Sequence, residues 1–169
     1  MPDQLKVGVA GYGVVGKRRR EYVDAHPALH TVAVSDITYD SDGTFEDGVQ
    51  YFNNYEKLLT HDLDILFVCL SNDVAAKATI GGLESSFHVF CEKPPGRNMA
   101  DIAAVKKAAK TYKSKILKYG FNHRYHESVQ EAIQIVRSGE LGEIINLCGM
   151  YGKSKLISWG QTTWRTERE

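Results

Sequence analysis

Short apolar runs alternate with segments of helical periodicity along most of this chain, and no other feature limits the possible fold as strongly. The apolar runs are about four to eight residues long, which is the length of strands that are buried on both faces. They cover residues 6–11, 30–36, 64–71, 88–92 and 115–122. Helical spacing covers 14–25, 73–84 and 99–112, with a brief helix in the segment "YEKLLTH".

Strands that alternate with helices imply βαβ crossovers and a parallel sheet. Residues 37–54 are polar and rich in turn residues, so one crossover is expected to be short or irregular. Asp73 is a plausible N-cap for the helix that follows it. We therefore expect an α/β fold, with a Rossmann-type doubly wound parallel sheet over residues 1–121.

Beyond residue 121 the pattern changes. The segment 126–144 predicts an amphipathic helix that stops at Gly139, and 144–152 predicts a strand. The remaining tail is polar and aromatic with no evident core face. Residues 122–169 are therefore expected to begin a second α/β domain, and the chain looks truncated.

The hexapeptide "GYGVVG" follows the first expected strand and opens the first expected helix. In a dinucleotide site, Gly11 permits the tight turn, Gly13 lets the backbone approach a pyrophosphate, and Gly16 lets the helix pack on the strand. The intervening residues Tyr12, Val14 and Val15 would line the same cradle, where free N–H groups hold the anion. A purely structural glycine turn is the alternative.

Asp36 ends the second expected strand, at the distance from the glycines that a ribose-binding acid requires. Its carboxylate can accept hydrogen bonds from both ribose hydroxyls and would repel a 2′-phosphate, which favours NAD over NADP. The basic run "KRRR" that follows Gly16 is expected to form a solvated face, and a phosphate partner is the alternative.

Leu70, Ser71 and Asn72 follow the central strand at its carboxyl end, where open parallel sheets bind ligands. They are candidates for cofactor contact, or Ser71 and Asp73 only cap the next helix. Lys93, with Glu92 before it and Pro94 after it, ends the next strand at the same edge. Prolines restrict the backbone there, and one X–Pro bond is a candidate for the cis form. The Lys93 ammonium could stabilise negative charge on a substrate oxygen, and a surface lysine is the alternative.

The next junction offers further polar candidates. Asn122, His123 and Arg124 follow the last expected strand, where they could face a substrate. His123 is suited to proton transfer by its ordinary pKa, but a histidine that packs or caps at a domain junction is the more common case.

The pieces "GYGVVG", Asp36, "HVFCEKP", "GFNHRYH" and "SGELGEI", in this order, resemble the glucose–fructose oxidoreductase / inositol dehydrogenase / rhizopine catabolism (Gfo/Idh/MocA) family. The most specific piece is Glu92-Lys93-Pro94. The resemblance implies a Rossmann domain followed by an α/β domain whose open sheet mediates oligomerisation, as a dimer or tetramer. It also implies hydride transfer between NAD(P) and a secondary alcohol of a sugar, inositol or nucleotide-sugar.

The resemblance further implies that Lys93 touches both the nicotinamide and the substrate, and that Trp164 and Arg165 lie beside the active site. Two departures stand out. Ala75 stands near the place of a histidine that many members carry. Members are also about twice as long, and their Asp and His acid/base would come after Glu169, so this chain alone is expected to be inactive. A non-catalytic NAD-binding sensor on the same scaffold is the alternative function.

Composition excludes several other classes. Lys plus Arg and Asp plus Glu both number 21, so charge gives no case for nucleic acid or an anionic membrane as partner. No apolar stretch approaches the roughly 18 residues of a membrane span, and the N-terminus lacks a signal-peptide pattern. Cys69, Cys91 and Cys148 are odd in number and far apart, with no metal-ligand spacing. The sequence thus predicts a cytoplasmic protein with no metal site.

Overall fold

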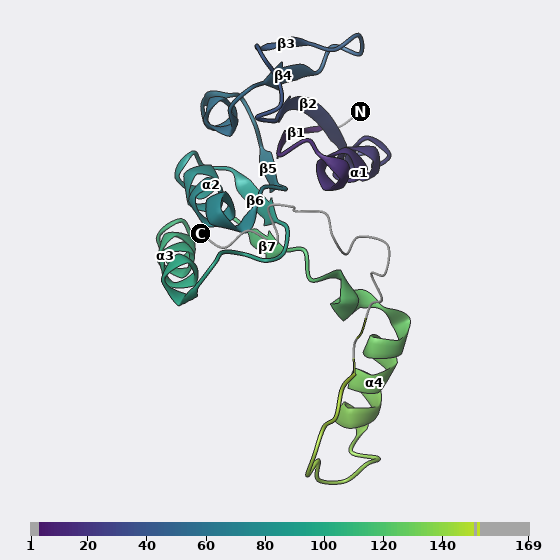
Figure 1. Cartoon of the computed structure of the whole chain (residues 1–169). Coiled ribbons are helices and arrows are strands. Elements are labelled where there is room, and N and C mark those ends of the chain that lie inside the picture. The colour runs from purple at the N-terminus through teal and green to yellow at the C-terminus, as the bar shows by residue number, and fades with distance from the viewer. Residues whose placement is uncertain (1–3, 151, 153–169) are drawn as a thin grey trace, which may run out of the picture. The chain divides into compact units, whose positions relative to one another are not determined.

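The computed structural model describes residues 4–150 and residue 152, and the chain divides into two units after Asn122. The first unit contains a sheet of seven strands, whose order is β3-β4-β2-β1-β5-β6-β7 (Figure 1). All neighbouring strands are parallel except β3 and β4. The strands are β1 (Leu5–Ala10), β2 (Leu29–Ser35), β3 (Gly43–Thr44), β4 (Gln50–Phe52), β5 (Ile65–Val68), β6 (His88–Cys91) and β7 (Leu117–Tyr119).

The strand order places a switch point between β1 and β5. From β1 the chain moves outward to β2 and then β4 on one side, and it returns to build β5, β6 and β7 on the other. The parallel strands all end at one edge of the sheet. In open sheets of this kind, ligands bind outside the carboxyl ends of the strands at the switch point. The expected Rossmann-type fold is therefore confirmed.

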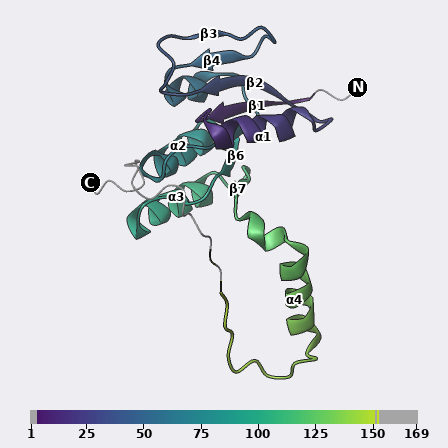
Figure 2. The same ribbon diagram turned by 45° about the vertical axis from the view of Figure 1, so that its right-hand side comes forward.

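Helices cover both faces of the sheet. Helix α1 (Val14–Asp24) contributes Val23 to a core cluster with Val7, Val9 and Val34. The opposite cluster receives Leu58 from the 3₁₀ helix η1 (Tyr55–Thr60) and Leu83 from α2 (Asn72–Glu84). Helix α3 (Met99–Thr111) packs beside α2 (Figure 2). Because both faces are covered, the central strand β5 is apolar throughout rather than alternating.

The segment 37–54 contains the β3–β4 hairpin, which the sequence did not predict. The crossover from β2 to β4 contains no helix, as the turn-rich composition indicated. Strand β4 runs parallel to β2, with Val34 opposite Tyr51. The hairpin is held by aromatic packing, because Phe45 lies 4.8 Å from Tyr51 between ring centroids.

Two expectations about local structure are wrong. Asp73 is not the N-cap of α2, since the helix begins one residue earlier and Ser71 occupies the cap position. Residues 144–150 and 152 form no strand. An apolar run can pair as a strand only where another strand offers its backbone groups, and the described part of the chain offers none to this run.

The second unit contains α4 (Glu127–Ser138), which follows the 3₁₀ helix η2 (Asn122–Tyr125) at the unit boundary. Helix α4 stops where the sequence predicted, because Gly139 adopts a left-handed conformation with φ of 77°.

Candidate functional site

The turn between β1 and α1 is built on its three glycines. Gly11 has φ of 86°, and a Cβ there would lie 2.5 Å from the carbonyl oxygen of Cys69. A Cβ on Gly16 would lie 1.9 Å from the carbonyl oxygen of Gly11. A Cβ on Gly13, by contrast, would meet nothing within 4 Å. Gly11 and Gly16 are therefore required by the fold itself, whereas Gly13 leaves open space above the turn.

The N-terminus of α1 faces that open space. Gly13 is its N-cap, no side chain caps it, and its first turn contains no acidic residue. The exposed residues Val14 and Val15 begin the helix. Backbone N–H groups in the first turn of a helix have no intrahelical partner, and the helix dipole makes them attractive to an anion. The turn therefore fits a phosphate group.

Asp36 lies at the carboxyl end of the neighbouring strand β2 and is fixed by three hydrogen bonds. The backbone N–H of Tyr12 donates to Oδ2 at 2.8 Å. The backbone N–H and the hydroxyl of Thr38 both donate to Oδ1, at 3.0 and 2.8 Å. Each carboxylate oxygen can accept about two hydrogen bonds, so Oδ2 keeps capacity for a hydroxyl donor. Beside it, Ile37 is 88% exposed and offers an apolar surface that the sequence reasoning did not consider.

The exit of β5 adjoins the glycine turn directly. The N–H of Cys69 donates to the carbonyl of Ala10 at 2.7 Å, and a Cβ on Gly11 would lie 3.2 Å from Leu70 Cδ2. Ser71 and Asn72 come next and are half-buried. Ser71 takes the cap position that the capping alternative expected, but its hydroxyl makes no capping bond there.

Glu92 and Lys93 follow β6 at the same edge of the sheet. The Lys93 side chain is exposed, and the Lys93–Pro94 peptide is cis. The Lys93 N–H donates to Glu92 Oε2 at 3.3 Å. On its other oxygen, Glu92 accepts from Arg19 Nε at 2.7 Å, and the Arg19 guanidinium lies 5.3 Å from the centroid of the Phe90 ring.

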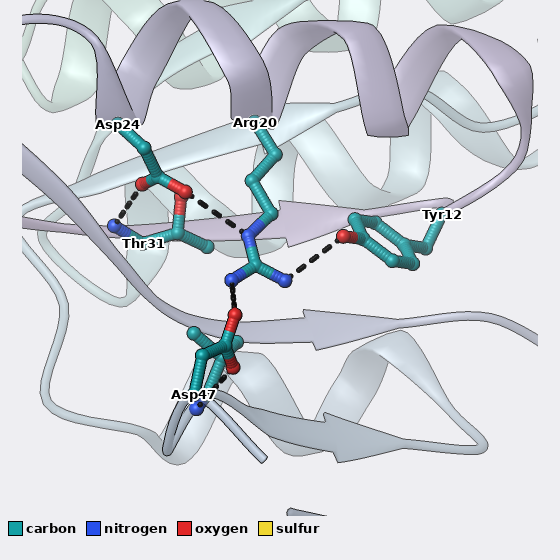
Figure 3. A network of polar contacts seen from close by, with 6 residues as sticks. Tyr12, Arg20, Asp24, Thr31 and Asp47 are labelled. Carbon is teal, nitrogen blue, oxygen red and sulfur yellow. Dashed lines mark hydrogen bonds and ion pairs between the residues drawn. The ribbon is translucent and has the colours of Figure 1, made fainter. Parts of the chain in front are cut away.

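The basic run after the glycine turn is not the solvated face that the sequence suggested. Arg19 is paired with Glu92, and Arg20 is paired with Asp24 and Asp47 and bonded to the Tyr12 hydroxyl (Figure 3). Burial alone would lower the pKa of Arg20, but these hydrogen bonds outweigh burial and raise it. Only Lys17 and Arg18 of this run are exposed. Two of these partners, Glu92 and Asp47, are distant in sequence, so the run itself gave no signal of them.

The remaining candidates lie elsewhere. Asn122, His123 and Arg124 form most of η2, and all three are exposed. The His123 ring packs against the His126 ring with centroids 4.8 Å apart. Trp164 and Arg165 lie outside the described residues. In the described part of the chain, no cluster of three or more His, Cys, Asp or Glu side chains could hold a metal, and no helix is long and apolar enough to span a membrane.

Comparison with known sequences places this geometry in context. The sequence pattern of the Gfo/Idh/MocA family, described as an oxidoreductase family with an NAD-binding Rossmann fold, matches residues 5–121. The uncharacterized oxidoreductase YrbE of Bacillus subtilis is 30% identical over 150 residues, which are 84% of this chain and 42% of YrbE. Inositol 2-dehydrogenase of Salmonella typhimurium is 27% identical over 159 residues, 90% of this chain and 47% of that enzyme.

The fold matches solved structures as well. Scyllo-inositol dehydrogenase from Lactobacillus casei, solved with bound cofactor NAD(H) and scyllo-inositol, superposes with a TM-score of 0.73. The match covers 83% of this chain and 43% of that one, at 21% sequence identity, and so shows the fold alone. The chain spans less than half the length of the curated relatives it matches.

Proposed function

Because this chain belongs to the Gfo/Idh/MocA family of oxidoreductases, with its NAD-binding Rossmann fold, we propose that it is the cofactor-binding part of an NAD-dependent dehydrogenase. The substrate is a secondary alcohol of a sugar, an inositol or a nucleotide-sugar. One observation carries the proposal: the open space above Gly13 lies at an uncapped helix N-terminus, with a fixed carboxylate at the end of the next strand.

The residues of the glycine turn would hold the dinucleotide. Its pyrophosphate would lie over Gly13, against the N–H groups at the start of α1. Tyr12, Val14 and Val15 would line the cradle, with Gly11 and Gly16 shaping it. Leu70, Ser71 and Asn72, at the exit of β5, would contact the middle of the cofactor.

Asp36 would accept a hydrogen bond from the adenosine ribose through the free capacity of Oδ2, and its charge would oppose a 2′-phosphate. The exposed side chain of Ile37 would pack against the adenine ring. Only the Asp36 contact favours NAD, because the adenine ring is the same in NAD and NADP.

Lys93 would orient the substrate. When bound, the nicotinamide accepts or donates a hydride at C4, and the chain supplies placement and charge. The Lys93 ammonium would donate a hydrogen bond to the alcohol oxygen and stabilise the negative charge that develops there. Glu92 would place the backbone of Lys93 through its bond to the Lys93 N–H. Further substrate contacts are proposed for Asn122, His123, Arg124, Trp164 and Arg165.

The proposed substrate class is supported by relatives named inositol 2-dehydrogenase, which act on a ring with secondary hydroxyls. Assembly into a homo-oligomer stays a prediction, as does a cytoplasmic location.

The test has two arms. Titration of this chain with NADH and with NADPH, followed by nicotinamide fluorescence, should show tighter binding of NADH; a clear preference for NADPH would contradict the assignment of Asp36. In the whole protein, Lys93→Met should retain NADH binding while turnover of an inositol or sugar falls by about two to three powers of ten. Unchanged turnover in that variant would remove Lys93 from the mechanism. A whole protein that binds NADH but turns over no inositol or sugar would favour the non-catalytic sensor.

A further inference from the structure

Four side chains beside the glycine turn form a polar network centred on Arg20, which we call the Arg20 cluster (Figure 3). Tyr12 precedes α1, Arg20 and Asp24 lie on α1, and Asp47 lies in the turn between β3 and β4. Arg20 is the central member, and its side chain is only 14% exposed. The sequence indicated Tyr12 as a lining residue and Arg20 only as part of the basic run, and it gave no role to Asp24 or Asp47.

Every nitrogen of the Arg20 guanidinium has a partner in this cluster. Nε donates to Asp24 Oδ2 at 3.1 Å, Nη1 donates to the Tyr12 hydroxyl at 2.9 Å, and Nη2 forms an ion pair with Asp47. Two carboxylates surround one guanidinium, so the cluster carries a net negative charge. The guanidinium is therefore charged, and each of its nitrogens is already engaged.

Tyr12 joins this cluster to the candidate ribose site. Its backbone N–H donates to Asp36 Oδ2, and its hydroxyl accepts from Arg20. The Tyr12 ring lies between these two contacts and packs against Phe45, with centroids 6.0 Å apart. Arg20 and Asp36 thus bind to opposite ends of one residue, and Tyr12 with its two hydrogen bonds spans the distance between them.

In Rossmann domains that accept NADP, an arginine near the end of the second strand receives the 2′-phosphate. In this chain Arg20 lies on the helix that follows the glycine turn, but its guanidinium is already paired with the carboxylates of Asp24 and Asp47. We propose that Asp24 and Asp47 determine cofactor specificity by withholding Arg20 from a 2′-phosphate. The inference rests on the proposed function, in which this turn binds a dinucleotide.

The preference for NAD then has two separable causes. Asp36 repels the 2′-phosphate directly. The Arg20 cluster keeps the guanidinium of Arg20 from binding that phosphate. Replacing Asp36 alone removes the first cause and leaves the second, so it should not by itself produce strong NADPH binding. A merely structural role of the cluster, which also ties the β3–β4 hairpin to α1, would change the affinities for both cofactors alike.

Asp47→Asn is the variant that isolates the second cause. Asp47 Oδ1 accepts a hydrogen bond from the Val49 N–H at 3.2 Å, and an asparagine can keep that bond. The variant therefore removes charge with little change in shape. Asp42→Asn is the matched control, since Asp42 is also a partly exposed carboxylate of the 37–54 segment but pairs with Lys57 instead.

The experiment compares the ratio of NADPH to NADH dissociation constants in Asp36→Ser, Asp36→Ser/Asp47→Asn and Asp36→Ser/Asp42→Asn, with circular dichroism to confirm folding. The Asp47 double variant should lower the ratio by about five-fold or more relative to Asp36→Ser, because one charge-assisted contact becomes available. The Asp42 control should match Asp36→Ser. Adding Arg20→Gln to the Asp47 double variant should remove the gain.

Equal ratios in the Asp47 and Asp42 double variants would overturn the inference and leave the proposed function intact. A gain that survives Arg20→Gln would also overturn it, because the cation would then be another one. If the unaltered chain binds neither cofactor, the proposed function fails and this inference fails with it.

Discussion

Arg19 on α1 donates from Nε to Oε1 of Glu92 at 2.7 Å, although the two residues are 73 positions apart. Their side chains are 25% and 12% exposed. The Arg19 guanidinium also lies over Phe90, whose ring stacks on Phe67 with centroids 4.9 Å apart. The helix that begins at the glycine turn is thereby fastened to the segment that carries Lys93.

Breaking this ion pair from one side should destabilise the chain. Arg19→Ala leaves the Glu92 carboxylate mostly buried without its cation, so we expect the free energy of unfolding to fall by about 1–3 kcal/mol. The neighbouring exposed Arg18→Ala is the matched control, with a change of about 0.5 kcal/mol or less. Urea denaturation measures both. Equal effects of the two variants would show that the Arg19–Glu92 pair contributes nothing specific.

Gly13 and Gly16, the second and third glycines of the turn, should respond differently to alanine. Gly13→Ala adds a methyl group into open space, so the free energy of unfolding should change by no more than about 1 kcal/mol. The same methyl group would occupy the place proposed for the pyrophosphate, and NADH affinity should fall about ten-fold or more. Thermal unfolding and NADH titration separate the two effects. Unchanged NADH affinity in the folded variant would count against the cradle.

Gly16→Ala is the contrasting variant, because its Cβ would lie 1.9 Å from the Gly11 carbonyl oxygen. Neither atom belongs to a flexible side chain, so the backbone itself must move. We expect a loss of about 3 kcal/mol or more in unfolding free energy, with a lower melting temperature. A variant of normal stability would mean that the close contact between α1 and the carbonyl of Gly11 is absent in solution.

The buried thiols should make the chain sensitive to alkaline pH. Burial raises the pKa of Cys69 to about 12 and the pKa of Cys91 to about 11, from an ordinary value of 9.0. Above pH 9 the unfolded chain therefore loses thiol protons that the folded chain retains, so stability decreases as pH rises. Chemical denaturation between pH 8 and about 9, where most unfolded tyrosines keep their protons, measures the decrease.

Thiol labelling provides the control for that prediction. Cys148 is exposed, whereas Cys91 is buried. At about pH 8 iodoacetamide should modify Cys148 in the folded chain and reach Cys69 and Cys91 only after denaturation. Rapid labelling of all the cysteines without denaturant would show that the two thiols are not shielded.

Two N-cap positions offer a further contrast. Asn98 caps α3 by accepting from the N–H groups of Ala100 and Asp101, at 2.9 and 3.1 Å. Asn98→Ala should cost about 1 kcal/mol of stability. Ser71 makes no such bond at the start of α2, so Ser71→Ala should cost much less while weakening NADH binding. A large stability loss with normal NADH binding in Ser71→Ala would restore the capping explanation.

Those parts of the fold that depend on local pattern could be predicted from the sequence. Apolar runs of strand length, helical spacing between them and the glycine hexapeptide are each contained in a short window, and they fixed the Rossmann architecture. The stop of α4 at Gly139 is equally local. Asp36 was found because its distance along the chain from the glycines is set by a single helix and strand.

Other features depended on partners far along the chain. The β3 and β4 strands are two and three residues long, too short for any periodic signal, and they pair only because β2 presents its outer edge. Arg19 and Arg20 looked like surface charges, since no residue near them in the sequence indicates that Glu92 or Asp47 is a partner. The run 144–152 has the composition of a strand, but composition does not supply the second strand with which it must pair.

The Glu92 carboxylate has one more neighbour, because a Cβ on Gly120 would lie 2.8 Å from Oε2. The chain passes this point immediately before it leaves the first unit. The absence of a side chain at position 120 therefore leaves the space that the Glu92 carboxylate occupies. Any larger residue there would push the carboxylate toward Arg19 or toward Lys93. A substitution at Gly120 would therefore change the position of Lys93, the residue proposed to orient the substrate.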